Sequence, residues 1–166
     1  MSAGWVAGSV RARAMSRHRI GGAAACGLAA HRGLEGAITA VADTAYGRDV
    51  RPGQSLATAQ RAVVASVLWN LRVLAGWQPP QGVATMRLLL GAVEVTNVRE
   101  HLEAMQGTQR HEPYRLGMLA SAWSRLATTT RPAQVRDLLA SSVWGDPGGE
   151  TPTTSPCSCA SHWPTG

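Results

Sequence analysis

The stretch Gln60–Met105 constrains the fold most, because its pattern predicts two long helices joined at a Pro-Pro turn. Apolar residues recur every three or four positions in both arms, which is the period of an amphipathic helix. The sequence GWQPPQG at Gly76–Gly82 ends the first arm and opens the second. So short a linker is typical of antiparallel neighbours, so we expect a central antiparallel helical hairpin. In the first arm the predicted apolar face is Val63, Val64, Val67, Leu68, Leu71, Leu74 and Ala75.

The composition also favours helices. Ala, Leu and Val dominate the apolar residues, Phe is absent and only two Tyr occur. Ala and Leu are strong helix formers, whereas strands favour β-branched and aromatic residues in alternation. We therefore expect an all-α fold, a compact bundle of about five to six helices. Residues 1–145 are predicted to form one helical domain, and 146–166 a disordered tail rich in Pro, Ser, Thr and Gly.

Helix signals outside the hairpin place the other elements. Ser55 is a candidate N-cap for the first arm, and Pro132 suits the first turn of a helix, where its missing N–H costs nothing. Further helices are expected over residues 2–30 with a break at Gly21–Gly22, and over 33–45, 114–127 and 132–142.

Glu94 and Asn97 stand three residues apart on the apolar stripe of the second arm. A buried polar group without a hydrogen-bond partner costs roughly 1–3 kcal/mol, so this pair needs partners. One reading is that both side chains satisfy helix ends or loop carbonyls and fix the register of the bundle. The other is that they meet another protein of an assembly, or support the surface that does.

Other apolar and aromatic residues are expected inside the fold. Trp69, Trp77 and Trp123 lie at helical positions that are more often core than interface. Cys26, alone in an Ala-rich helix, is predicted to be a small buried hydrophobe.

Catalytic patterns are scarce. The chain contains no Lys, which excludes a GxxxxGK[ST] phosphate loop, a Schiff base and a Lys general base. The histidines are scattered, and Arg99 with Glu103 predicts an exposed pair rather than an acid–base site. The CxC at Cys157 and Cys159 lacks the second ligand pair of a zinc site. We expect no enzymatic activity, no cofactor and no metal.

The formal net charge is +6, and four arginines lie in the first twenty residues without any acid: Arg11, Arg13, Arg17 and Arg19. A basic surface helix is the first interpretation, and contact with phosphate or anionic lipid is the second. Asn70 and Arg72 interrupt the best apolar run, so no membrane span is expected. The lack of a span predicts a soluble chain, and the cysteine usage points to a reducing compartment, so we expect a cytoplasmic protein. The alternative function that they leave open is a basic helical nucleic-acid-binding or assembly protein, although nucleic acid is the less favoured partner.

Three stretches resemble one family: DTAYG at Asp43–Gly47, LWNLRVLAGW at Leu68–Trp77 and VEVTNVREHL at Val93–Leu102, with RLGMLASAW at Arg115–Trp123 extending the likeness. The family comprises the C subunits of archaeal-type and bacterial V-type ATPases, known as the d subunits in the vacuolar enzyme. Its members are helical proteins about twice as long. The resemblance thus covers their N-terminal half, and the tail is consistent with truncation or a shifted reading frame.

The resemblance implies a non-catalytic role in proton or sodium transport. Members of that family cap the membrane rotor ring and link it to the central stalk, while other subunits bind nucleotide. The implied partners are rotor-ring and stalk subunits, and the implied location is cytoplasmic, peripheral on the inner face of the plasma membrane. The residues that it assigns to the bundle and its partner contacts are Arg72, Trp77, Glu94, Asn97 and Arg99.

Overall fold

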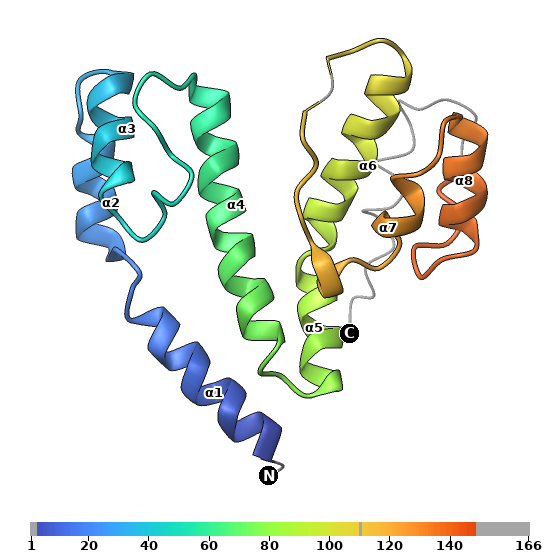
Figure 1. Ribbon diagram of the computed structural model, residues 1–166, viewed down its shortest axis with the longest axis horizontal. Coiled ribbons are helices and arrows are strands. Elements are labelled where there is room, and N and C mark those ends of the chain that lie inside the picture. The colour runs from blue at the N-terminus through green and yellow to red at the C-terminus, as the bar shows by residue number, and fades with distance from the viewer. Residues whose placement is uncertain (1–2, 110, 149–166) are drawn as a thin grey trace. The chain divides into compact units, whose positions relative to one another are not determined.

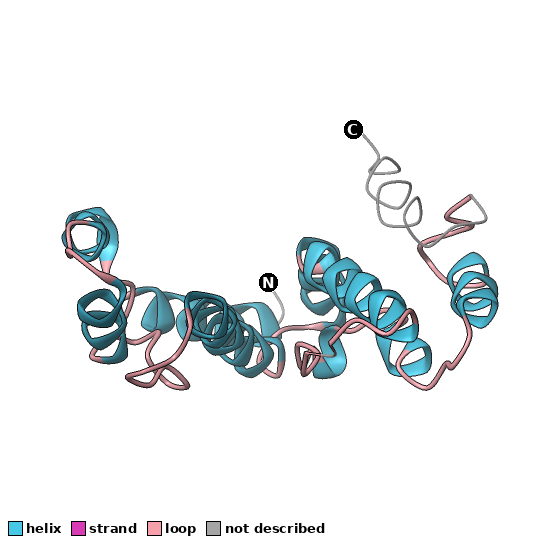
Figure 2. Cartoon of the chain, turned by 90° about the horizontal axis from the view of Figure 1, so that it is seen from above, coloured by secondary structure: helices cyan, strands magenta, loops and turns pink. Residues whose placement is uncertain are grey.

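The computed structural model describes residues 3–109 and 111–148, and all regular elements in these residues are helical (Figures 1 and 2). The predicted all-α class is confirmed. In chain order the elements are α1 (Ala3–Ser16), α2 (Gly21–Ala29), α3 (Leu34–Ala42), α4 (Leu56–Ala75), α5 (Pro80–Leu89), α6 (Gly91–Met105), a 3-10 turn η1 (Gly117–Leu119), α7 (Trp123–Leu126) and α8 (Pro132–Ala140).

The chain divides into two compact units, residues 1–82 and 83–166, with the boundary inside α5. Each unit has buried residues of its own. The expected single helical domain over 1–145 stays a prediction. So does the disordered tail over 146–166, of which residues 149–166 lie outside the described residues.

The core of the first unit joins α3, the following loop and α4. Ile38, Val50, Ala59 and Ala62 form it and are all at most 8% exposed. Ser55 caps α4 as predicted, because its hydroxyl accepts the backbone N–H of Thr58 at 3.2 Å.

Two glycines fix close approaches in the first unit. Gly47 is buried at the end of the DTAYG turn, where an added Cβ would overlap the backbone carbonyl of Ala42. Gly8 brings α1 against the chain after α4, since a Cβ at Gly8 would lie 2.6 Å from the side chain of Gln78. One face of α1 is thereby packed, and the other faces outward.

The core of the second unit is assembled from α6 and the short elements that follow it. Its apolar members are at most 9% exposed: Leu90, Leu102, Leu116, Leu119, Ala122, Trp123, Leu126, Val135 and Leu139. Pro132 begins α8, as its position in the sequence predicts.

The second arm of the predicted hairpin is two helices rather than one. Leu90 separates α5 from α6 with φ −91° and ψ 3°, and Gly91, a poor helix residue, follows it. The absent side chain of Gly91 makes room for Trp144, whose ring would lie 2.6 Å from a Cβ there. Because α4 and α6 belong to different units, the antiparallel packing of the hairpin stays a prediction.

Several burial predictions are wrong. Val67 on the expected apolar face is 37% exposed, while Ser66 beside it is 1% exposed. Trp69 and Trp77 are 42% and 53% exposed, and Cys26 is also exposed. Trp123 is buried, as predicted. The errors share a cause, since a helical period identifies an apolar face without showing how far the neighbouring helices cover it.

The helix predicted over 114–127 is also wrong. Only η1 and the four-residue α7 form in this range, and the chain before them is irregular. The reason lies in the side chains of α6, which bind the backbone groups that a helix would need.

Candidate functional site

A buried polar stripe on α6 is the most distinctive arrangement in the second unit. Glu94, Asn97 and His101 are spaced three and four residues apart, which places them on one face of the helix. Their exposed fractions are 1%, 1% and 7%. We call these three residues the α6 clamp, because all of them bind the segment 113–129.

Glu94 binds the start of α7. Its Oε1 accepts the backbone N–H groups of Ala122 at 2.7 Å and Trp123 at 2.6 Å. Both carboxylate oxygens lie 3.0 Å from the N–H of Ser121. The first N–H groups of any helix lack partners within that helix. Glu94 therefore caps α7 from another helix, while the N-cap residue Ala122 makes no side-chain capping bond of its own.

Asn97 binds both backbone polar groups of Tyr114. Its Nδ2 donates to the Tyr114 carbonyl at 2.9 Å, and its Oδ1 accepts the Tyr114 N–H at 2.8 Å. One amide side chain thus replaces the two bonds that a neighbouring strand or helix turn would make. This pairing keeps residue 114 out of a helix.

His101, the last residue of the stripe, binds Thr129 at the end of the segment. Its Nε2 lies 3.0 Å from the Thr129 hydroxyl and 3.2 Å from the Thr129 carbonyl. The hydroxyl hydrogen is used on the carbonyl of Leu126 at 2.7 Å, so both Thr129 oxygens act as acceptors. Nε2 therefore carries a hydrogen. The ring also meets Trp123 edge to face, with the centroids 5.7 Å apart.

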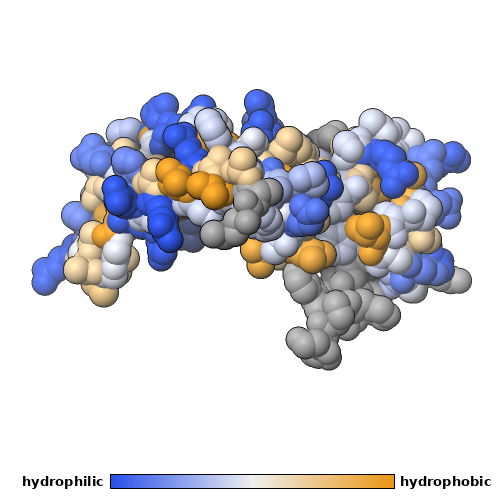
Figure 3. Space-filling model, turned by 90° about the horizontal axis from the view of Figure 1, so that it is seen from below, coloured by the Kyte–Doolittle hydropathy of each residue, from blue (hydrophilic) through white to orange (hydrophobic). Residues whose placement is uncertain are grey.

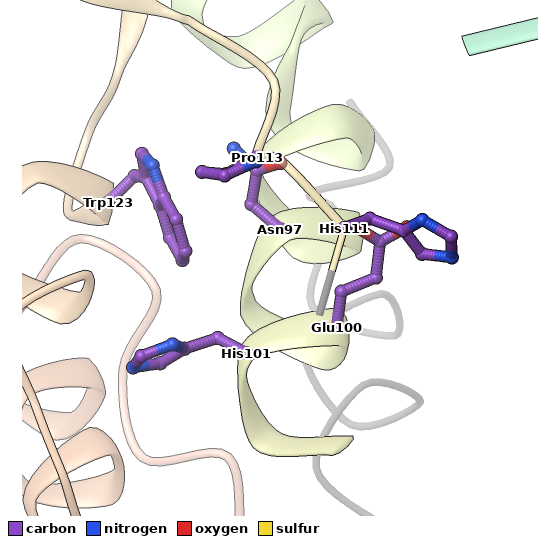
Figure 4. A pocket seen from close by; sticks show the side chains of 6 residues that line it. All are labelled: Asn97, Glu100, His101, His111, Pro113 and Trp123. Atoms are coloured by element: carbon purple, nitrogen blue, oxygen red, sulfur yellow. The ribbon is translucent and has the colours of Figure 1, made fainter. Parts of the chain in front are cut away.

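A small hollow lies beside the clamp (Figure 4). Residues from α6, the following segment and α7 line it: Asn97, Glu100, His101, His111, Pro113 and Trp123. Although two histidines and a glutamate line it, no group of three or more His, Cys, Asp or Glu in the described residues is arranged to hold a metal ion. The polar groups of the clamp are directed at backbone atoms and at the Thr129 hydroxyl.

The five residues assigned to partner contacts occupy different environments. Glu94 and Asn97 are buried together, as above, whereas Arg99 is on the solvent side of α6. Arg99 pairs with Glu103 at 3.6 Å, and both side chains are about half exposed, which confirms the predicted surface pair. Arg72 and Trp77 are exposed in the first unit. The partner role of the set stays a prediction.

Two contacts in the structure were not predicted from the sequence. His101 carried a usable signal, because it stands four residues after Asn97 on the same helical face. Arg48 lies over the ring of Trp69, with its Cζ 4.2 Å from the ring centroid. That cation–π contact joins a loop to α4 and has no local pattern that could reveal it.

Comparison with known proteins adds no relative to this picture. No protein-family model matches the chain, and no curated protein or solved structure matches it significantly. None of the helices in the described residues is long and apolar enough to cross a bilayer.

Proposed function

We propose that this chain is a non-catalytic, subunit-like protein that acts through protein contacts, as the rotor-capping C and d subunits of V-type ATPases do. In this role it links the central stalk to the membrane rotor ring in ion-transport coupling. It works on the cytoplasmic side, held at the membrane by the ring. Its partners are other ATPase subunits.

The observation that carries the proposal is what the side chains of VEVTNVREHL bind, since this stretch resembles the family most strongly. Its Glu94 and Asn97 bind backbone groups of the segment 113–123 within their own unit. These contacts favour a structural role for the two residues, in shaping a helical unit, over a role in binding or converting a substrate. It agrees with a family whose members support and connect other subunits.

Exposed side chains supply candidate contacts for the partners. Trp77 is 53% exposed two residues after the end of α4, and Arg72 is exposed about one turn before that end. Trp and Arg are the residues most enriched among those that dominate protein interfaces. Arg99 extends the candidate set in the second unit.

The test is co-purification from the cell that produces the chain. Tagged protein is recovered from gently solubilised membranes, and its associated subunits are identified by mass spectrometry. We expect rotor-ring and central-stalk subunits, with less of both for Trp77→Ala and Arg72→Ala. The matched control is Arg32→Ala, another exposed arginine of the same unit. Recovery of the chain without ring and stalk subunits would refute the proposal.

Gene order gives an independent check. Genes for rotor and stalk subunits beside this one support the ATPase role. Neighbours from an unrelated complex would favour the rival role of an assembly protein with no link to ATPases.

A further inference from the structure

The outward face of α1 carries a stripe that the proposed function does not use. Val6, Val10, Arg13 and Arg17 follow one another at steps of four, three and four residues. At 3.6 residues per turn these steps place all four residues on one side of the helix axis. Arg17 directly follows the last residue of α1. We call these four residues the α1 stripe.

The rest of the first unit leaves this stripe uncovered. Gly4 and Gly8 lie on the opposite side of α1, against Pro79 and Gln78. Val6 and Val10 are 50% and 62% exposed, and Trp5 beside them is 42% exposed. Figure 3 shows one face of the molecule, on which hydrophobic residues are exposed among hydrophilic ones.

The charge on this part of the molecule has one sign. The first 34 residues contain five arginines and no acid. None of the ion pairs in the described residues involves the four arginines of this region, Arg11, Arg13, Arg17 and Arg19. The first acidic residue in the sequence is Glu35. The positive charge is therefore available to an external anion.

We propose that the α1 stripe binds the surface of an anionic phospholipid membrane. Arginines near an anionic membrane surface contribute electrostatic attraction, and apolar residues add to binding when they enter the boundary between headgroups and acyl chains. Arg13 and Arg17 would meet lipid phosphates, while Val6 and Val10 enter the boundary between headgroups and acyl chains. A nucleic-acid backbone offers phosphates but no apolar layer, so it would leave the two valines in water.

This inference goes beyond the proposed function, because it requires no ATPase subunit. The test uses the full-length chain and sedimentation with sucrose-loaded vesicles. One set is an equal mixture of phosphatidylglycerol and phosphatidylcholine, and the other is phosphatidylcholine alone. We expect binding to the anionic vesicles, weaker binding at higher salt, and little binding to the neutral ones.

Two double variants test the two halves of the stripe. Arg13→Gln with Arg17→Gln should weaken binding roughly 10-fold or more, since each arginine near an anionic surface contributes separately. Val6→Ser with Val10→Ser should also weaken it. The control, Arg32→Gln with Arg131→Gln, makes the same charge change at exposed arginines outside the stripe. Circular dichroism verifies that each variant keeps its helices.

Three results would overturn the inference. One is no binding to anionic vesicles by the unaltered chain. Another is equal weakening by the control and by the Arg13 and Arg17 variant, which would reduce the effect to net charge. The last is full binding by the Val6 and Val10 variant together with tighter binding to double-stranded DNA or RNA at the same salt, which would make the stripe a nucleic-acid site.

Discussion

Replacing Glu94 by glutamine tests the α6 clamp with almost no change in shape. The Glu94 carboxylate accepts N–H groups from three consecutive residues at 2.6 to 3.0 Å, in a position that is 1% exposed. A glutamine keeps one oxygen acceptor but loses the charge. It also turns an NH2 group toward the N–H of Ser121, where Oε2 stands 3.0 Å away.

The expected loss follows from these contacts. A hydrogen bond to a charged group contributes about 1.5–3 kcal/mol and a neutral one about 0.5–1.5 kcal/mol, a difference of roughly 1 kcal/mol per bond. With three donors affected and one of them facing another donor, Glu94→Gln should destabilise the second unit by about 2–3 kcal/mol. Glu94→Ala should cost about 3–5 kcal/mol, because it leaves two buried N–H groups and the part-buried one of Ser121 without an acceptor.

Urea unfolding followed by circular dichroism measures the total change, and amide hydrogen exchange locates it. Protection of the Ser121, Ala122 and Trp123 amides should fall by roughly 30-fold or more, since 1.4 kcal/mol is tenfold in an equilibrium constant. Glu103→Gln is the matched control, as Glu103 lies on the same helix with its side chain 49% exposed. Equal stability of the Glu94 and Glu103 variants, with unchanged protection of the three amides, would show that the clamp does not hold α7.

Three further substitutions have definite expected outcomes. Asn97→Asp places a second oxygen against the carbonyl that Nδ2 now meets at 2.9 Å, so thermal unfolding should show a loss of about 2–4 kcal/mol. Gly47→Ala drives a Cβ into the backbone of Ala42, so the first unit should lose about 1–3 kcal/mol in urea unfolding; an unchanged midpoint would contradict that packing. Gly91→Ala should displace Trp144, seen as a shift of tryptophan emission to longer wavelength, and no shift would argue against their contact.

The local features of the chain were the predictable part of the fold. Ser55 and Pro132 mark helix starts by chemistry that acts within one turn, and both marks are correct. The break near Gly21 was predictable for the same reason, because Gly21 adopts φ 72°, which other residues avoid. These signals need no knowledge of distant contacts.

The segment after Met105 was not predictable in this way. Leu116, Leu119 and Trp123 repeat at intervals near the helical period and are indeed buried, yet only fragments of helix form around them. Asn97 takes the backbone bonds of Tyr114 from 17 residues away, and Glu94 caps α7 from 27 to 29 residues away. Tertiary hydrogen bonds therefore outweigh local propensity here. The sequence indicates that Glu94 and Asn97 need hydrogen-bond partners, but no local rule identifies those partners.

The clamp also explains how such short elements persist. Forming the first turn of a helix is unfavourable, and helices of three or four residues do not form alone in water. In this chain η1 spans three residues and α7 four, and both lie within the segment that the clamp holds. The clamp bonds described above end on backbone atoms, apart from the one to the Thr129 hydroxyl. The path of the segment is therefore set by α6, which leaves the exposed side chains of the segment, such as Met118, free to serve a partner surface.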